Sequence, residues 1–184
     1  MERLKDLLRP AYYLARSIAH VLLAPLHALH SWLVPWFGGE IFMLLGLHAI
    51  AATVWVGGMF FALLVLRPAM GELDPAARVA LHRAVLRRFL PVVWVAMPVM
   101  LLSGARIMAK AYGRFVWAPW PVQAMAGIGV VMACVFLVLW FGPYKRLRAA
   151  QTLPDAVTAI DKIRWLITLN LVLGLVTTLL AGMG

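Results

Sequence analysis

Four long runs of apolar residues constrain this chain more strongly than any other feature of its sequence. They cover residues 41–66, 89–108, 122–141 and 163–180, and they hold almost no formal charge. A helix needs about 20 residues to cross the hydrocarbon core of a bilayer, a length that these runs match. Because a backbone in hydrocarbon must satisfy its own hydrogen bonds, the runs predict transmembrane helices. We therefore predict an all-α integral membrane protein built on a four-helix bundle.

The composition excludes an ordinary soluble domain. Hydrophobic residues make up 64% of the 184 residues and charged residues 13%, with a mean hydropathy of +0.91, whereas soluble domains are only about half apolar. The net charge of +10 could indicate a nucleic-acid partner, but the basic residues cluster between the apolar runs, as in membrane proteins. We expect a lipid bilayer and no nucleic acid as the partner. No HExxH, GxSxG, GxGxxG or phosphate-loop motif points to hydrolytic or nucleotide chemistry.

The basic residues also predict an orientation. The connections at residues 67–88 and 145–164 carry five arginines or lysines each, whereas the second connection has Lys110, Arg114 and the nearby Arg106. Cytoplasmic loops carry an excess of positive charge. The two strongly basic connections should therefore face the cytoplasm of a bacterial inner membrane, and the C-terminus should face the periplasm.

Residues 1–40 precede this membrane domain of residues 41–184 and hold a further hydrophobic segment. Residues 17–36, SIAHVLLAPLHALHSWLVPW, carry no formal charge. The segment either spans the bilayer with its basic N-terminus inside, as the charge rule favours, or lies as an amphipathic helix at the outer surface. Its two prolines and three histidines weaken the spanning interpretation. Both alternatives stay open at this point.

A faint internal repeat suggests how the four runs are organised. A shift of 75 residues aligns Pro68 with Pro143, together with several alanine, leucine and phenylalanine pairs of a kind that also match by chance. If the repeat is structural, the bundle consists of two helical hairpins related by an axis along the membrane normal. His48 and Gln123 would then be equivalent positions at the same depth.

His48 is the strongest candidate for a functional side chain. It lies roughly 10 Å inside the first run by helix rise, and Trp55 and Met59 share its helix face. The adjacent pair Gly57-Gly58 would let another backbone or a flat ligand approach closely. An ionisable side chain inside a membrane span costs free energy to insert, so such a residue is first interpreted as functional. The alternative is a histidine that only forms a hydrogen bond between helices.

Three further histidines lie in the N-terminal segment. His20, His27 and His30 fall within about 80° of one helix face, and imidazole is a ligand for copper, zinc and haem iron. If residues 17–36 and the first run form a hairpin, His30 and His48 lie at a similar depth. They could then supply two axial nitrogens to a haem or most of a copper site. The alternative is a weakly polar face of an interfacial helix.

Softer donors and a cation complete the candidate set. The thioethers of Met59 and Met97 suit copper(I), although methionines in an apolar bundle usually serve packing. Arg106, near the outer end of the second run, could pair with a haem propionate or simply extend to water.

Four segments resemble the CopD family, the copper-resistance D type of bacterial inner-membrane protein. They read HAIAATVWVGGMFFALLVLRPAM, RRFLPVVWVAMPVMLLSG, PYKRLRAA and IRWLITLNLVLGL, and the resemblance covers roughly residues 41–181. It implies a helical membrane domain associated with copper uptake or resistance. In that interpretation His48 is the central copper ligand, His27, His30, Met59 and Met97 are further donors, and a periplasmic copper protein is a candidate partner.

A more distant similarity is to the HemJ type of protoporphyrinogen oxidase, which also has a histidine seven residues before a tryptophan, as His48 and Trp55 are here. It implies haem b as the cofactor. That family expects a lysine at the start of the third helix, where this chain reads WPVQAMAG. Copper handling is therefore the leading prediction. The alternatives are a b-type haem protein with His48 and His27 or His30 as axial ligands and a redox partner, and a non-catalytic assembly factor.

Overall fold

The computed structural model describes residues 39–183 and, nearer the N-terminus, residues 24–25, 28 and 31. The chain divides into two compact units, Met1–Met43 and Leu44–Gly184. Whether residues 17–36 cross the bilayer, and what His20, His27 and His30 do, falls outside the described residues. These points stay predictions.

The second unit is a bundle of long helices. In the described part of the chain every regular element is helical. Four helices are long and apolar enough to cross a membrane: Glu40–Glu72, Pro75–Tyr112, Trp120–Ala149 and Leu153–Ala181. Each contains one of the four predicted runs, so the predicted all-α membrane bundle is confirmed and the chain is a multi-pass membrane protein.

The first span alternates between two kinds of helix. In chain order its parts are α2 (Glu40–Ala52), η1 (Thr53–Gly57), α3 (Gly58–Phe61), η2 (Ala62–Leu66), α4 (Arg67–Ala69) and η3 (Met70–Glu72). The segments η1 and η2 are π-helical turns, and η3 is a 3₁₀ turn. A π-turn closes an i→i+5 hydrogen bond and so takes in more residues than an α-helical turn.

The spacing of the buried residues accounts for these π-turns. Ala51, Trp55 and Met59 are buried and Leu63 is partly buried, at intervals of four residues. In a continuous α-helix of about 3.6 residues per turn, each interval of four would rotate the side chain by about 40° around the axis. The wider π-turns counteract that rotation. The apolar stripe therefore keeps facing the bundle along the span.

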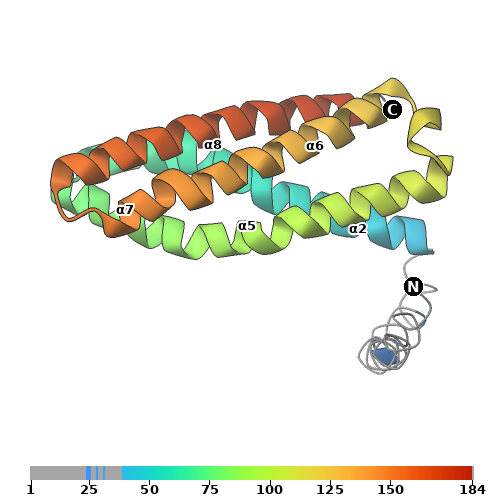
Figure 1. Ribbon diagram of the computed structural model, residues 1–184, viewed down its shortest axis with the longest axis horizontal. Coiled ribbons are helices and arrows are strands. Elements are labelled where there is room, and N and C mark those ends of the chain that lie inside the picture. The colour runs from blue at the N-terminus through green and yellow to red at the C-terminus, as the bar shows by residue number, and fades with distance from the viewer. Residues whose placement is uncertain (1–23, 26–27, 29–30, 32–38, 184) are drawn as a thin grey trace, which may run out of the picture. The chain divides into compact units, whose positions relative to one another are not determined.

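The remaining spans follow in antiparallel order. They are α5 (Pro75–Tyr112), α6 (Trp120–Leu139) with its continuation through the π-turn η5 (Trp140–Tyr144) into α7 (Lys145–Ala149), and α8 (Leu153–Ala181). A 3₁₀ turn, η4 (Phe115–Trp117), lies in the connection between α5 and α6. Figure 1 shows α5, α6 and α8 extended alongside one another, and contacts link all three pairs.

Two basic segments that the sequence placed between runs are helical instead, and in this respect the sequence interpretation was wrong. Arg78, Arg83, Arg87 and Arg88 lie on α5, and Lys162 and Arg164 lie on α8. Capping explains the difference: Asp74 accepts hydrogen bonds from the backbone N–H groups of Ala76 and Ala77, both at 3.0 Å. Thr152 caps α8 in the same way. The helices therefore extend beyond the apolar runs that identified them.

The opposite end of α5 has a different stop signal. Gly113 has a φ of 74°, which favours glycine, and its N–H donates to the carbonyl of Ala109 at 3.0 Å. The guanidinium of Arg114 then lies 5.8 Å from the centre of the Trp117 ring. Tryptophan and arginine are side chains that anchor helix ends at the membrane surface. The Arg114–Trp117 pair therefore marks this end of the bundle as interfacial.

An aromatic series runs through the core. The ring centres of Trp55 and Phe136 lie 6.4 Å apart, those of Phe136 and Trp94 5.4 Å, those of Trp94 and Trp140 5.6 Å, and those of Trp140 and Tyr144 5.1 Å. The first three pairs are edge-on, a favourable geometry. The rings come from the first span, α5, α6 and η5, so they join these elements.

Glycines let neighbouring spans approach closely. A Cβ added at Gly58 would lie 2.3 Å from Phe89 Cε2, and one at Gly174 would lie 2.8 Å from Val56 Cγ2. The sequence suggested that the glycines beside Trp55 admit a backbone or a flat ligand. The space at Gly58 is instead filled by the Phe89 ring of α5. These contacts follow the rule that small residues permit helix packing in lipid, where the hydrophobic effect gives little drive for association.

Gly58→Ala should destabilise the bundle, because the added methyl group would overlap the Phe89 ring. Overpacking of this kind costs about 1–3 kcal/mol of unfolding free energy. Gly57→Ala is the matched control, since its Cβ would meet only Thr53 Cγ2, at 4.0 Å. Thermal unfolding of the detergent-solubilised protein measures both.

The cost of Gly58→Ala should largely disappear in a Phe89→Ala background, where a double-mutant cycle isolates the contact. Equal destabilisation by the two glycine substitutions would contradict the packing described.

Candidate functional site

The His48 side chain joins α2 to α5. Its Nδ1 lies 2.9 Å from the carbonyl oxygen of Met100 and 3.1 Å from the hydroxyl oxygen of Ser103. The imidazole is half-buried, whereas Ser103 is only 3% exposed. The ring is therefore directed at the neighbouring span.

These partners determine which ring nitrogen carries the proton. A carbonyl oxygen only accepts hydrogen bonds, so the Nδ1–H of His48 donates to Met100. The Ser103 hydroxyl donates to the carbonyl of Val99 at 2.6 Å, which leaves its oxygen able to accept from the same Nδ1–H. In a neutral imidazole, Nε2 then holds the lone pair. Both partners found for the ring among the described residues lie at Nδ1, so Nε2 is the nitrogen that can bind a ligand.

Gly104 sets how closely the imidazole approaches α5. A Cβ added there would lie 3.0 Å from Cε1 and 3.4 Å from Nδ1 of His48. The ring edge therefore lies against the helix backbone at a position where only glycine leaves room without adjustment. Sequence reasoning identified His48 but missed Gly104 and the Met100 carbonyl. The adjacent small residues Ser103 and Gly104 were the available signal, but one sequence does not reveal which helices face each other.

Trp55 and Met59 share the inward face of the first span with His48 but lie deeper. Trp55 is 1% exposed and Met59 2%, and Trp55 packs edge-on against Phe136. By helix rise they lie roughly 10 Å and 16 Å along the axis from His48. One ion cannot contact both His48 and Met59 over that distance, so the structure does not bring these two candidate ligands together.

The candidates on α5 lie closer to the level of His48. Met97 is buried and lies one turn from Met100, about 5 Å by helix rise. Arg106 lies within one turn beyond Ser103 and its side chain is exposed. Gln123 is held at the start of α6, where its Nε2 donates to the carbonyl of Ala118 at 2.8 Å.

Within the described residues, no group of three or more histidine, cysteine, aspartate or glutamate side chains could hold a metal ion. The other described histidine, His82, lies on the arginine-rich part of α5, where its Nδ1 is 2.9 Å from the carbonyl of Arg78 in the same helix. Of the two histidines in the described part of the chain, His48 is therefore the one whose side chain connects two spans. A metal bound there needs further donors, from methionine sulfurs or from residues outside the described part.

Asn170 is a second buried polar side chain in the bundle, on α8. It is 2% exposed, and its Nδ2 donates to the carbonyl of Met132 at 3.1 Å. The carbonyl can only accept, so the amide must present nitrogen to it. Its Oδ1 has no hydrogen-bond partner among the described residues. The side chain therefore joins α8 to α6.

A family model described as copper resistance protein D, CopD, matches residues 83–183. This range covers more than half of the chain and includes Met100, Ser103 and Gly104, but it does not include His48. No curated protein and no solved structure matches the chain. The family match therefore includes the residues of α5 that contact the His48 ring, but not His48 itself.

The hydrogen bond to Met100 predicts that His48 is the Nδ1–H tautomer. Nitrogen-15 NMR of histidine-labelled protein in micelles distinguishes the two tautomers, and the His48→Ala variant assigns the signal. Gly104→Ala should perturb that signal, because its Cβ would press on the ring at 3.0 Å. Gly127→Ala, whose Cβ would meet nothing within 4 Å, should leave it unchanged. An Nε2–H tautomer would contradict the geometry.

Proposed function

The chain belongs to the CopD family of copper resistance proteins, and on that premise we propose that it handles copper at one face of a bacterial inner membrane, with the His48 imidazole as a ligand. Copper is the cargo of the site in this proposal. A site of this kind would serve uptake, resistance or delivery to a periplasmic copper protein.

The observation that carries the proposal is the hydrogen bond from His48 Nδ1 to the Met100 carbonyl, at 2.9 Å. A histidine that binds a metal through one nitrogen typically donates the N–H of the other to a carbonyl or carboxylate, which fixes the tautomer and aims the lone pair. His48 has that arrangement. Imidazole nitrogen is also a ligand type that copper favours.

One imidazole does not complete a copper site, so the proposal includes further donors. Met97 and Met100 lie on α5 near the level of His48, and their thioethers would select copper(I) over harder ions. His27 and His30, which precede the first span, are the proposed nitrogen donors from the N-terminal segment. Met59, deep in the core, is a less suitable ligand for the same ion.

The distribution of charge supports an orientation for the site. The segments rich in arginine and lysine lie at residues 67–88 and 145–164, at the end of the bundle away from His48. The positive-inside rule assigns that end to the cytoplasm. His48 then lies near the periplasmic face, where copper arriving from outside would first meet the protein.

The copper proposal is tested by competition for copper(I) between the full chain in mild detergent and a chromogenic chelator. His48→Ala should weaken binding by more than about tenfold, a loss that removal of even a supporting residue can cause. His82→Ala is the matched control, because its imidazole also bonds a carbonyl but lies on the arginine-rich part of α5. It should leave the affinity unchanged.

Unchanged copper affinity in the His48→Ala variant would overturn the proposed ligand. The same preparation tests the alternatives through its absorption spectrum and metal content. A Soret band that is lost in His48→Ala would support haem b in place of copper. Absence of both copper and haem after growth with ample metal would support an assembly role.

The orientation is tested with single cysteines in a Cys134→Ala background. Val116→Cys, in the exposed connection between α5 and α6, should react with a membrane-impermeant maleimide on intact spheroplasts. Gln151→Cys, exposed between α7 and α8, should react only after the membrane is broken. The reverse pattern would place His48 on the cytoplasmic side.

A further inference from the structure

Two cavities open where the arginine-bearing ends of the spans meet. One is a groove of about 650 Å³ between α5 and α7, lined by Arg83, Arg87, Pro91, Tyr144, Leu147 and Arg148 among others. The other, of about 430 Å³, lies between the first span, α5 and α8. Both volumes fall in the range of about 300–1,000 Å³ that is common for small-molecule sites.

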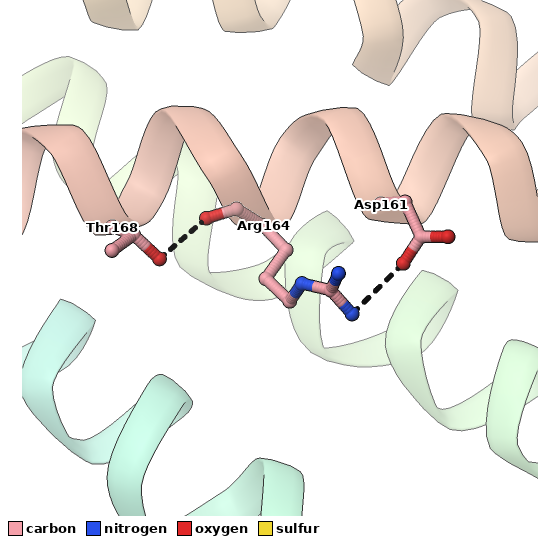
Figure 2. Close-up of polar contacts among 3 residues, drawn as sticks. All are labelled: Asp161, Arg164 and Thr168. Carbon is pink, nitrogen blue, oxygen red and sulfur yellow. Dashed lines mark hydrogen bonds and ion pairs between the residues drawn. The ribbon is translucent and has the colours of Figure 1, made fainter.

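Two of the three arginines that line the second cavity, Arg78 and Arg164, are already engaged, and Arg67 is the third. Arg164 Nη1 lies 2.9 Å from Asp161 Oδ1 on the same helix. Figure 2 shows this ion pair. Arg78 donates to the carbonyls of Met70, Gly71 and Leu73 at 3.0 to 3.1 Å, which caps the end of the first span. The carboxylate of Asp161, which also lines this cavity, offsets part of the positive charge that the cavity can offer to an anion.

The groove between α5 and α7 has three arginines and no carboxylate among its lining residues. Arg83 and Arg87 are four residues apart on α5 and so lie on one face, and Arg148 comes from α7. Like charges at this spacing repel one another. Arg83 is held in position by donating from Nη2 to the carbonyl of Ala150, at 2.7 Å. An anion in the groove would relieve the repulsion and meet an orientated guanidinium.

The groove also extends from charged to apolar surroundings. Pro91 lies about 12 Å further along α5 than Arg83 by helix rise, within the second apolar run. Pro91 is exposed, whereas Tyr144 of η5 and Leu147 of α7 are buried behind it at 6% and 0% exposure, so they form the packed floor of the groove. A free phosphate ion would use only the arginines. A molecule with an anionic head and an apolar tail would use the whole groove.

We propose that this groove binds the phosphate headgroup of an anionic glycerophospholipid from the surrounding leaflet. Arg83, Arg87 and Arg148 hold the phosphate, because guanidinium groups match phosphate oxygens in geometry and charge. The glycerol and the first acyl carbons lie along the exposed Pro91. Basic pockets between transmembrane helices are suited to such headgroups. This proposal rests on the membrane fold alone and not on copper.

Native mass spectrometry of the full chain, released from micelles doped with dioleoyl phosphatidylglycerol, tests the proposal. One phosphatidylglycerol should be retained per chain, in clear preference to dioleoyl phosphatidylcholine at the same concentration. Arg87→Gln combined with Arg148→Gln should lower the retained fraction by roughly tenfold or more, since each loses a charge-assisted hydrogen bond. Arg83 is left intact because it also bonds Ala150.

Arg146→Gln is the matched control, an exposed arginine of α7 that does not line the groove. It should retain the lipid as the unchanged protein does. If the double variant does not fold, Arg148→Lys replaces it and should also weaken binding, since lysine keeps the charge but lacks the planar fork. Equal retention of phosphatidylcholine, equal loss with Arg146→Gln, or full displacement by millimolar inorganic phosphate would each overturn the proposal.

Discussion

The hydrogen bond from His48 Nδ1 to the Met100 carbonyl is the interaction on which the candidate site depends. Hydrogen bonds between helices in a membrane contribute only about 0.6 kcal/mol on average to stability, so this one does little to hold the bundle together. Its effect is on orientation. By fixing the proton on Nδ1 it leaves the lone pair on Nε2, and by joining α2 to α5 it sets where that lone pair points.

The same packing rule builds both the bundle and the site. Gly58 receives the Phe89 ring, Gly174 receives Val56, and Gly104 receives the His48 ring. In lipid these close contacts replace much of the drive that hydrophobic burial supplies in water. The imidazole thus occupies a position that an apolar side chain could fill. What distinguishes it is the polar pair formed by Met100 and Ser103 on the facing helix.

Hydropathy predicted the four spans because the bilayer imposes length and apolar character on each helix separately. It placed the starts of the second and fourth helices too late, because Asp74 and Thr152 cap helices that begin well before the apolar runs. His48 was identifiable as a costly polar residue in a span. The partners of His48 could not be identified from the sequence, because every residue has a backbone carbonyl and the sequence does not show which one lies near the ring. The separation of His48 and Met59 along the axis follows from helix rise alone, and the structure adds that Trp55 and Met59 lie in the core.

The two π-turns of the first span affect the direction in which the His48 side chain points. Each π-turn takes in one residue more than an α-turn, and both lie between His48 and the arginine-bearing end. Conversion of either turn to regular α-helix would shift the register by one residue, which corresponds to about 100° of rotation. With the arginine end anchored, that rotation would swing the imidazole away from Met100. The helical register set by η1 and η2 therefore determines the direction in which the His48 side chain points.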